Sequence, residues 1–205
     1  KFGLMCIQKG HSAMKRYGNL YEQIYSMDNL RKAHKNARKG KGWYEEVKEV
    51  DANIEVYLKQ LQEMLINHTY HTSNYEKFIK KENGKEREIF KLSYFPDRIC
   101  QWAILQVIEP YLMRHMTKNT YSALPKRGIH KALHDVQEAM WKDVPNCQHC
   151  LKLDVRHYYP SINHDILKAK FRRLFKDAEL LWLLDEIIDS ICTANIEDLR
   201  NIWLL

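Results

Sequence analysis

Hydrophobic positions in the first 70 residues recur with a helical period. Residues 19–37 follow this pattern, and residues 44–66 follow it more strongly. In the second stretch, apolar residues step by three and four positions, which puts them on one face of an α-helix. That face consists of Val47, Val50, Ile54, Leu58, Leu61 and Leu65. We therefore expect one helix in each stretch, with a loop between them at residues 38–42.

The pattern changes to strand alternation around residue 83. Asn83-Gly84 lies between two runs that can alternate, and Asn-Gly is the strongest short signal for a tight β-hairpin. A ribbon of this kind with one basic face can lie along a phosphate backbone or a triphosphate, although lysines also protect edge strands against aggregation. The cations of the expected hairpin are Lys77, Lys80, Lys81, Lys85, Arg87 and Lys91.

Two further helices are expected after the hairpin. Pro96 and Asp97 suit the first turn of a helix, and Pro110 should kink this helix or end it early. Its apolar stripe is Phe95, Ile99, Trp102, Leu105, Ile108 and Leu112. After a loop at residues 117–128, a second helix begins and is broken at residues 143–147. Its apolar face is Ile129, Leu133, Val136 and Met140.

Residues 150–155 resemble a short buried strand. A turn then leads to a helix that Asn163 can cap, and a last apolar helix covers about residues 178–190. Leu167, Phe171 and Leu174 line the expected core face of the capped helix. Helices thus dominate, with a hairpin and one central strand between them, so we predict the α+β class.

Charge and composition narrow the choice of partner. The chain has 205 residues, 45% of them hydrophobic, and a formal net charge of +7. This charge fits a nucleic-acid partner, although many basic proteins bind nothing anionic. The basic loop at residues 38–42 is either a phosphate contact or a solvated loop. No apolar run approaches the roughly 18 residues of a membrane span, so we expect no membrane attachment.

The cysteines do not suggest a disulfide framework or a zinc site. There are five, an odd number, and they are scattered along the chain, which favours a reducing setting. Cys147 and Cys150 have CxxC spacing around His149. A structural zinc site needs four ligands, and no second pair exists. We therefore expect no zinc, with Cys150 as the first residue of the strand.

Asp154 is a lone carboxylate near the end of the expected strand, and Tyr158 and Tyr159 follow it. A carboxylate in this position commonly presents a ligand to a hard cation. Mg²⁺ is typically held by one or two protein carboxylates together with substrate phosphates. The alternative is that Asp154 ends the strand or caps the next helix, and that both tyrosines are packing residues.

Four segments, in order, resemble reverse transcriptases. LDVRHYYPSINHDIL resembles the first catalytic motif of the palm, and GKEREIFKLSYFPDRICQWAILQVIEPYL resembles the fingers. NTYSALPKRGIHKALHDVQ resembles a basic-Gly-x-His turn into a helix, and YGNLYEQIYSMDNLRKAHKNARKGKG resembles the N-terminal lead-in. The resemblance covers residues 17–190. It is strongest to the bacterial and phage enzymes of diversity-generating retroelements, with group II intron enzymes and retrons more distant.

The resemblance implies a role for each matching residue. Asp154 is expected to bind the catalytic Mg²⁺ ions, of which the full-length enzyme holds two, with the backbone carbonyl of Val155 as a second oxygen ligand. Tyr159 is expected to lie under the sugar of the incoming nucleotide as a steric gate, while Tyr158 faces the core. Lys85 and Arg87 would meet the triphosphate. The residues expected to contact the template or brace the fingers are Arg98, Lys126, Arg127 and His130.

The resemblance also implies domains and partners. Residues 14–149 would be the fingers and residues 150–190 a partial right-hand palm, between an unpatterned leader at 1–13 and an unmatched tail at 191–205. The implied partners are an RNA template, a DNA primer, a deoxynucleoside triphosphate and a small accessory protein, in the cytoplasm of a bacterium.

One expected motif is missing. The family's Tyr-x-Asp-Asp hairpin has no counterpart, and no Asp-Asp pair occurs in the sequence. A single carboxylate cannot hold two Mg²⁺ ions in the required geometry. We therefore expect an inactive, truncated piece of the enzyme. Two alternatives stay open: a non-catalytic nucleic-acid-binding module, and a piece completed by a second polypeptide.

Overall fold

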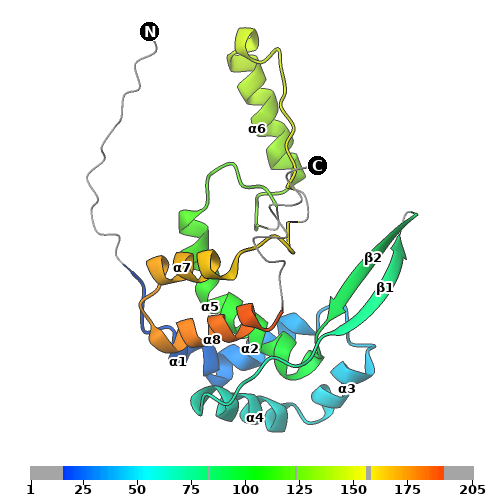
Figure 1. Cartoon of the computed structure of the whole chain (residues 1–205), viewed down its shortest axis with the longest axis vertical. Helices are drawn as coiled ribbons and strands as arrows, with labels where there is room; N and C mark the ends of the chain where they lie inside the picture. Colours follow the sequence, from blue (N-terminus) through cyan, green and yellow to red (C-terminus); the bar gives the residue numbers. More distant parts are fainter. Residues whose placement is uncertain (1–15, 83, 123, 156–157, 192–205) are drawn as a thin grey trace. The chain divides into compact units, whose positions relative to one another are not determined.

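The computed structural model describes residues 16–191, except residues 83, 123, 156 and 157 (Figure 1). The chain divides into two compact units. The first unit is Lys1–Ile108 with Tyr159–Leu205, and the second unit is Glu109–Tyr158. Helices dominate, and the one sheet of the described chain has two antiparallel strands. The coarse α+β class is therefore confirmed, while the polymerase palm, the leader and the tail stay predictions.

Four short helices open the first unit: α1 (Tyr21–Tyr25), α2 (Met27–Ala37), α3 (Glu45–Ala52) and α4 (Ile54–Ile66). The prediction of one continuous helix in each stretch was wrong. The first breaks at Ser26, whose hydroxyl accepts a bond from the Asn29 N–H at 3.4 Å. The second breaks at Asn53. The Ser26 side chain thus offers the backbone an alternative to the helical ladder, whereas the Asn53 side chain makes no capping hydrogen bond.

The apolar face of α3 and α4 forms much of the core. Val47, Val50, Leu58, Leu61 and Leu65 are all buried, as expected, and only Ile54 is partly exposed. Tyr21 from α1 packs against this core, and its hydroxyl donates to the Leu65 carbonyl at 2.7 Å. The three-and-four spacing therefore identified the buried face correctly, although the helix it lies on is broken.

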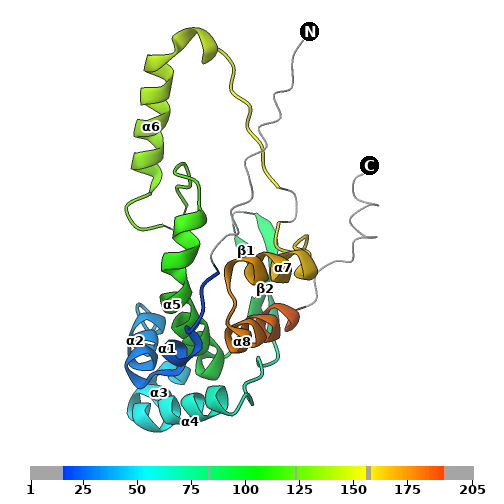
Figure 2. The same cartoon turned by 90° about the vertical axis from the view of Figure 1, so that its left-hand side faces the viewer.

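One carboxylate joins the two ends of the first unit. Asp177 precedes α8 (Ala178–Asp189) and accepts the Leu180 N–H at 3.2 Å. Its other oxygen accepts the N–H groups of Leu20 and Tyr21, at 2.7 and 3.1 Å. Asp177 thus caps the first turns of α8 and α1 together. The expected cap at Asn163 is confirmed as well, because its side chain accepts the Ile166 N–H at the start of α7 (His164–Leu174), which packs beside α8 (Figure 2).

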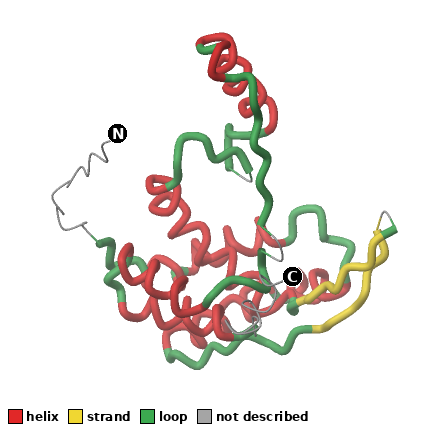
Figure 3. The backbone as a smooth tube through the Cα atoms, turned by 45° about the horizontal axis from the view of Figure 1, so that its top comes forward, coloured by secondary structure: helices red, strands yellow, loops and turns green. Residues whose placement is uncertain are grey.

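The hairpin consists of β1 (Glu76–Glu82) and β2 (Lys85–Lys91) (Figure 3). Glu82 pairs with Lys85, so the turn has two residues, and Gly84 takes the positive φ of 74° that such turns need. The predicted hairpin is confirmed, although Asn83 lies outside the described residues. Its cations are divided between the two faces, with positions 80, 85, 87 and 91 on one face. Lys77 and Lys81 lie on the opposite face from position 80, since side chains alternate along a strand.

Asp97 holds both ends of the hairpin in place. It is fully buried and accepts three hydrogen bonds: from the Tyr70 hydroxyl at 2.9 Å, the Ser73 N–H at 3.2 Å and the Ser93 hydroxyl at 2.7 Å. Ser73 precedes β1 and Ser93 follows β2. The expected place of Asp97 in a helical first turn is confirmed, because it lies in the first turn of a short π-helical stretch, Tyr94–Arg98, that leads directly into α5 (Ile99–His115).

Helix α5 contains Pro110 and runs on to His115, so of the two predicted effects of this proline, an early end is wrong and a kink stays a prediction. Its buried side chains are Ile99, Cys100, Ala103, Ile104 and Ile108, whereas Leu105 of the predicted stripe is exposed. The buried face therefore includes the small residues Cys100 and Ala103, which allow neighbouring elements to approach closely.

In the second unit no described residue is buried. Helix α6 (Ile129–Lys142) forms as predicted, and a short 3₁₀ turn, Val144–Asn146, follows it. Its predicted apolar face is exposed along its whole length. No helix in the described part of the chain combines the length and the apolar character that crossing a bilayer requires.

The predicted strand at residues 150–155 was wrong. These residues have no regular structure, and Leu151 and Leu153 are each 81% exposed (Figure 3). A strand forms only when its N–H and C=O groups find a partner strand. The described residues supply no partner strand to this segment. Its alternating apolar side chains are therefore not part of a hydrogen-bonded sheet.

Replacing Asp97 tests its importance for the hairpin. In Asp97→Asn, the amide cannot accept all three bonds, so buried donors lose their partner, and we expect a loss of about 2–4 kcal/mol in the free energy of unfolding. Urea denaturation measures this loss. As a control, Asp28→Asn removes only an exposed pair with Arg31 at 3.4 Å and should change stability by less than about 0.5 kcal/mol. Equal effects of the two substitutions would contradict the structural role of Asp97.

Candidate nucleic-acid interface

A cavity of about 630 Å³ lies at the root of the hairpin. We call it the hairpin-root pocket. Its walls come from the start of α3, the two strands and the first turn of α5. Five aromatic side chains line it: Tyr44, Tyr75, Phe78, Phe90 and Tyr94. Its volume is in the range of small-ligand sites, and every lining residue belongs to the first unit.

Two cations in this pocket lack an acidic partner. Lys41 and Arg98 both line it, and neither makes an ion pair with a described residue. The one acid in the lining, Glu46, accepts from Lys91 Nζ at 2.6 Å and from the Tyr94 N–H at 2.9 Å. These contacts, with Lys91 as the larger influence, lower the pKa of Glu46. The pocket therefore offers two positive charges to an anion.

The loop before α3 supplies both a cation and an aromatic surface. Gly40 has a φ of 71°, which lets the chain turn so that the Lys41 N–H donates to the Arg38 carbonyl at 2.8 Å. Trp43 and Tyr44 then stack, with ring centroids 3.9 Å apart and planes 21° apart. Trp43 is 68% exposed. Sequence reasoning considered this loop only for its charge and missed the adjacent aromatic pair, although GKGWY contained the signal.

Tyr94, one wall of the pocket, is held in place by a buried chain of polar contacts. Tyr94 contacts His34 Nδ1 through its hydroxyl at 3.0 Å, and His34 Nε2 contacts Asp51 at 2.8 Å. Asp51 also accepts from Arg38 at 2.6 Å. Burial, followed by the charge of Asp51, raises the pKa of Tyr94 to about 12. Tyr94 therefore stays a neutral donor, and the chain links the pocket to the basic loop.

The hairpin face that enters the pocket also carries the predicted nucleotide-binding positions. The ladder pairs Phe78 with Ile89 and Lys80 with Arg87, so these positions share one face with Lys85. Phe78 and Ile89 line the pocket. The side chains of Lys85 and Arg87 lie outside the described structure. On the opposite face, Lys81 pairs with Glu86 at 2.9 Å and Lys77 approaches Glu88 at 3.9 Å.

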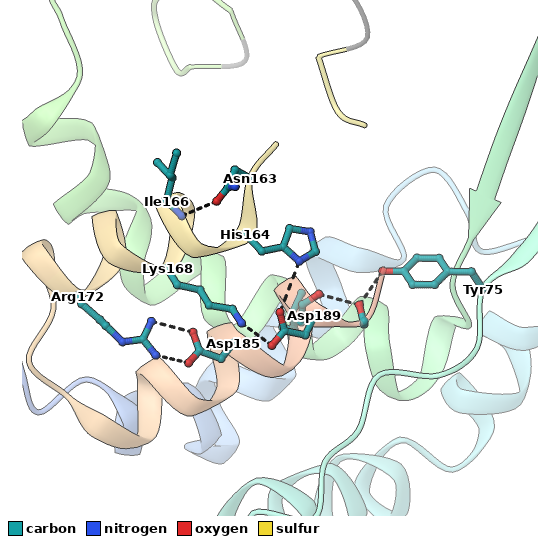
Figure 4. A network of polar contacts seen from close by, with 10 residues as sticks. Tyr75, Asn163, His164, Ile166, Lys168, Arg172, Asp185 and Asp189 are labelled. Atoms are coloured by element: carbon teal, nitrogen blue, oxygen red, sulfur yellow. Dashed lines mark hydrogen bonds and ion pairs between the residues drawn. The ribbon is translucent and has the colours of Figure 1, made fainter. Parts of the chain in front are cut away.

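The C-terminal end of α8 holds another residue of the pocket wall, Tyr75. Tyr75 lines the pocket, and its hydroxyl lies 3.0 Å from the Ser190 hydroxyl at the end of α8 (Figure 4). Helix α8 is in turn held to α7 by Lys168–Asp189 at 2.5 Å and by the Arg172–Asp185 pair. Lys168 is the main cause of the lowered pKa of Asp189. Residues far along the chain thus position the aromatic wall.

The second unit holds five of the predicted site residues. Lys126 is exposed with a φ of 61°, and His130 is exposed in the first turn of α6. Arg127 donates to the Thr117 carbonyl at 3.1 Å, which is a bracing contact within its loop. Asp154 is exposed in the irregular segment, as is Val155. Tyr159 belongs to the first unit, so Asp154 and Tyr159 lie in different units.

Tyr158 differs from its prediction. It is 56% exposed, whereas the resemblance implied that it faces the core. The expected core side depended on a buried strand at residues 150–155, and that strand is not formed. Tyr159 is also exposed.

An acidic cluster on α6 was not anticipated. Atoms of His134, Asp135 and Glu138 lie within 4.8 Å of one another, close enough to ligate a cation. Asp135 is already bonded to Lys131 and to the Tyr121 hydroxyl, and these bonds lower its pKa to about 2. Glu138 accepts from Lys142 at 2.5 Å. Neighbouring lysine side chains thus offset the negative charge of both carboxylates, so the cluster needs no metal ion for this purpose.

Comparison with known proteins gives limited information. No protein-family model matches the chain. Protein YkfC of Escherichia coli strain K12 is 26% identical to it over 147 residues. The match covers 69% of this chain and 37% of YkfC. The chain thus spans well under half the length of this relative.

The Glu46–Lys91 pair predicts a small pH dependence of stability. Because folding lowers the pKa of Glu46, its contribution is present above the unfolded value of about 4.3 and is lost as the pH falls through the folded value. We expect Glu46→Gln to be less stable than the wild type by under about 1 kcal/mol near pH 7, since the pair is exposed. The difference should shrink below about pH 4 in urea titrations. A difference that is constant down to pH 3 would contradict this account.

Proposed function

We propose that this chain forms the nucleic-acid-binding fingers of an RNA-directed DNA polymerase of the reverse transcriptase type. The single observation that carries the proposal is the hairpin face. Positions 80, 85 and 87 share this face with Phe78 and Ile89, which line the hairpin-root pocket. Arg98, predicted to contact template or brace the fingers, lines the same pocket. A basic ribbon that continues into an aromatic pocket suits a nucleic-acid strand, because cations follow the backbone and rings stack on bases.

The catalytic part of the proposal depends on Asp154 and on the resemblance. A carboxylate and the Val155 carbonyl are hard oxygen donors of the kind that Mg²⁺ prefers. These two groups fit part of an octahedral shell only, so the rest must come from other groups, among them substrate phosphates. When bound, Mg²⁺ would supply charge stabilisation during nucleotidyl transfer. Asp154 itself would hold its negative charge toward the ion, and Tyr159 would limit the space beneath the nucleotide sugar.

A second candidate is favoured by the exposed apolar side chains of the second unit. An independent domain buries a core of its own, yet no described residue of this unit is buried. The apolar face of α6 and the side chains at positions 151, 153 and 155 are both exposed. This pattern fits a piece that a further polypeptide completes, whether or not the completed assembly polymerises. In either case the basic fingers would bind template RNA, primer or deoxynucleoside triphosphate, with a small accessory protein as a possible second partner.

RNA binding by the 205-residue chain tests the first candidate. We expect affinity for a single-stranded RNA to fall linearly with salt on logarithmic axes. Lys85→Gln and Arg87→Gln should each reduce this slope by about 0.7, the value for one phosphate contact on a single strand. Fluorescence anisotropy at several salt concentrations measures the slope.

The opposite face of the same hairpin supplies the matched control. Lys81→Gln removes an equal charge that is already paired with Glu86 at 2.9 Å, so it should leave the slope unchanged. Equal effects of Lys81→Gln and Arg87→Gln would mean that only net charge attracts the RNA. Asp154→Asn should leave RNA binding intact, because the proposal assigns this residue to the metal and not to the RNA.

Limited proteolysis tests the second candidate. Because the second unit has no buried described residue, we expect trypsin to cut at Lys142 or Lys152 well before it cuts within α2 or α4 of the first unit. Gel electrophoresis and mass spectrometry would locate the cuts. A second unit as resistant as the first in the isolated chain would mean that it needs no further polypeptide.

A further inference from the structure

The hairpin-root pocket and the adjacent Trp43–Tyr44 stack form one continuous surface. Tyr44 belongs to both, since it lines the pocket and stacks on Trp43 at 3.9 Å. Trp43 is 68% exposed and Tyr44 is 42% exposed. Two adjacent exposed rings beside a pocket form a contiguous apolar surface of the kind that marks a binding site.

Charge decides which kind of occupant fits this surface. Lys41 and Arg98 lie at the pocket without acidic partners among the described residues, and Glu46 is engaged by Lys91 and by the Tyr94 N–H. Lys39, on the same loop, is also exposed. An apolar peptide or a second copy of an apolar helix would leave these cations unmatched. An occupant that combines a flat ring with a phosphate would satisfy both features.

We propose that this surface binds one unpaired nucleotide of a single-stranded RNA. The base stacks on Trp43 or enters the pocket beside Tyr44, and Lys41 and Arg98 contact its phosphate. The site is built entirely from the first unit and involves neither Asp154 nor Tyr159. The inference rests on the proposed RNA binding and adds the strand state of the ligand. A duplex, whose bases are stacked on each other, has no free ring to offer.

The volume supports a single nucleotide. At about 630 Å³ the pocket is in the range of small-ligand sites and large enough for one base and its sugar. Tyr75 and Tyr94 form walls that are held from behind by Ser190 and His34. A wall fixed in this way loses little conformational entropy when a ligand binds.

The test compares two tryptophans of similar exposure in the full chain. Trp43→Ala removes the proposed platform, and Trp141→Ala removes a side chain that is 77% exposed on α6. The probe is a fluorescein-labelled 12-nucleotide RNA, either single-stranded or annealed to its complement. We expect Trp43→Ala to weaken single-strand binding roughly five- to a hundred-fold, the usual effect of losing one base–aromatic stack. Duplex binding should change less than about two-fold, and Trp141→Ala should change neither.

A second variant separates stacking from folding. Trp43→Phe keeps an aromatic ring, so it should retain most of the single-strand affinity, and circular dichroism should be the same for all variants. If Trp43→Ala binds single strands as well as Trp141→Ala does, the nucleotide site is wrong while the proposed RNA binding stands. If the folded wild-type chain binds no RNA, both proposals fail. If Trp43→Ala weakens single-strand and duplex binding equally, selectivity for an unpaired nucleotide is wrong.

Discussion

The buried carboxylate of Asp97 is the contact on which the first unit depends most. A two-stranded ribbon is only marginally stable by itself, so its direction must be set at its ends. Asp97 binds the segment before β1 and the segment after β2 at once, and it adds the Tyr70 hydroxyl from the chain that follows α4. Removal of this charge from water is compensated only because all three donors are present. The pocket, the aromatic wall and the cationic face all take their positions from this anchored root.

Local signals in the sequence predicted local structure well. Asn83-Gly84 predicted the hairpin, and Asn163 predicted a cap that the Ile166 N–H confirms. The spacing of apolar residues identified the buried face of α4. These features depend on neighbours within a few residues, which the sequence displays directly.

Features that depend on contacts between distant parts of the chain were harder to predict from the sequence. The segment at residues 150–155 alternates as a strand does, but alternation cannot supply a partner strand. The helix break at Asn53 is not marked by any capping hydrogen bond of its side chain. The hairpin-root pocket brings Lys41, Phe78 and Arg98 together from three elements, and no spacing along the chain predicts that. Its aromatic component was visible beside the basic loop, yet only the structure relates Trp43 to the pocket.

The double cap at Asp177 has a consequence for how the chain matures. Helix α1 leaves the ribosome early, but its first N–H groups remain without their acceptor until residue 177 has been synthesised. Contacts of such long sequence separation slow folding. The N-terminal helices should therefore stay partly formed until the segment that carries Asp177 has been synthesised. A chaperone that shields their apolar surface during this interval should raise the yield of folded chain.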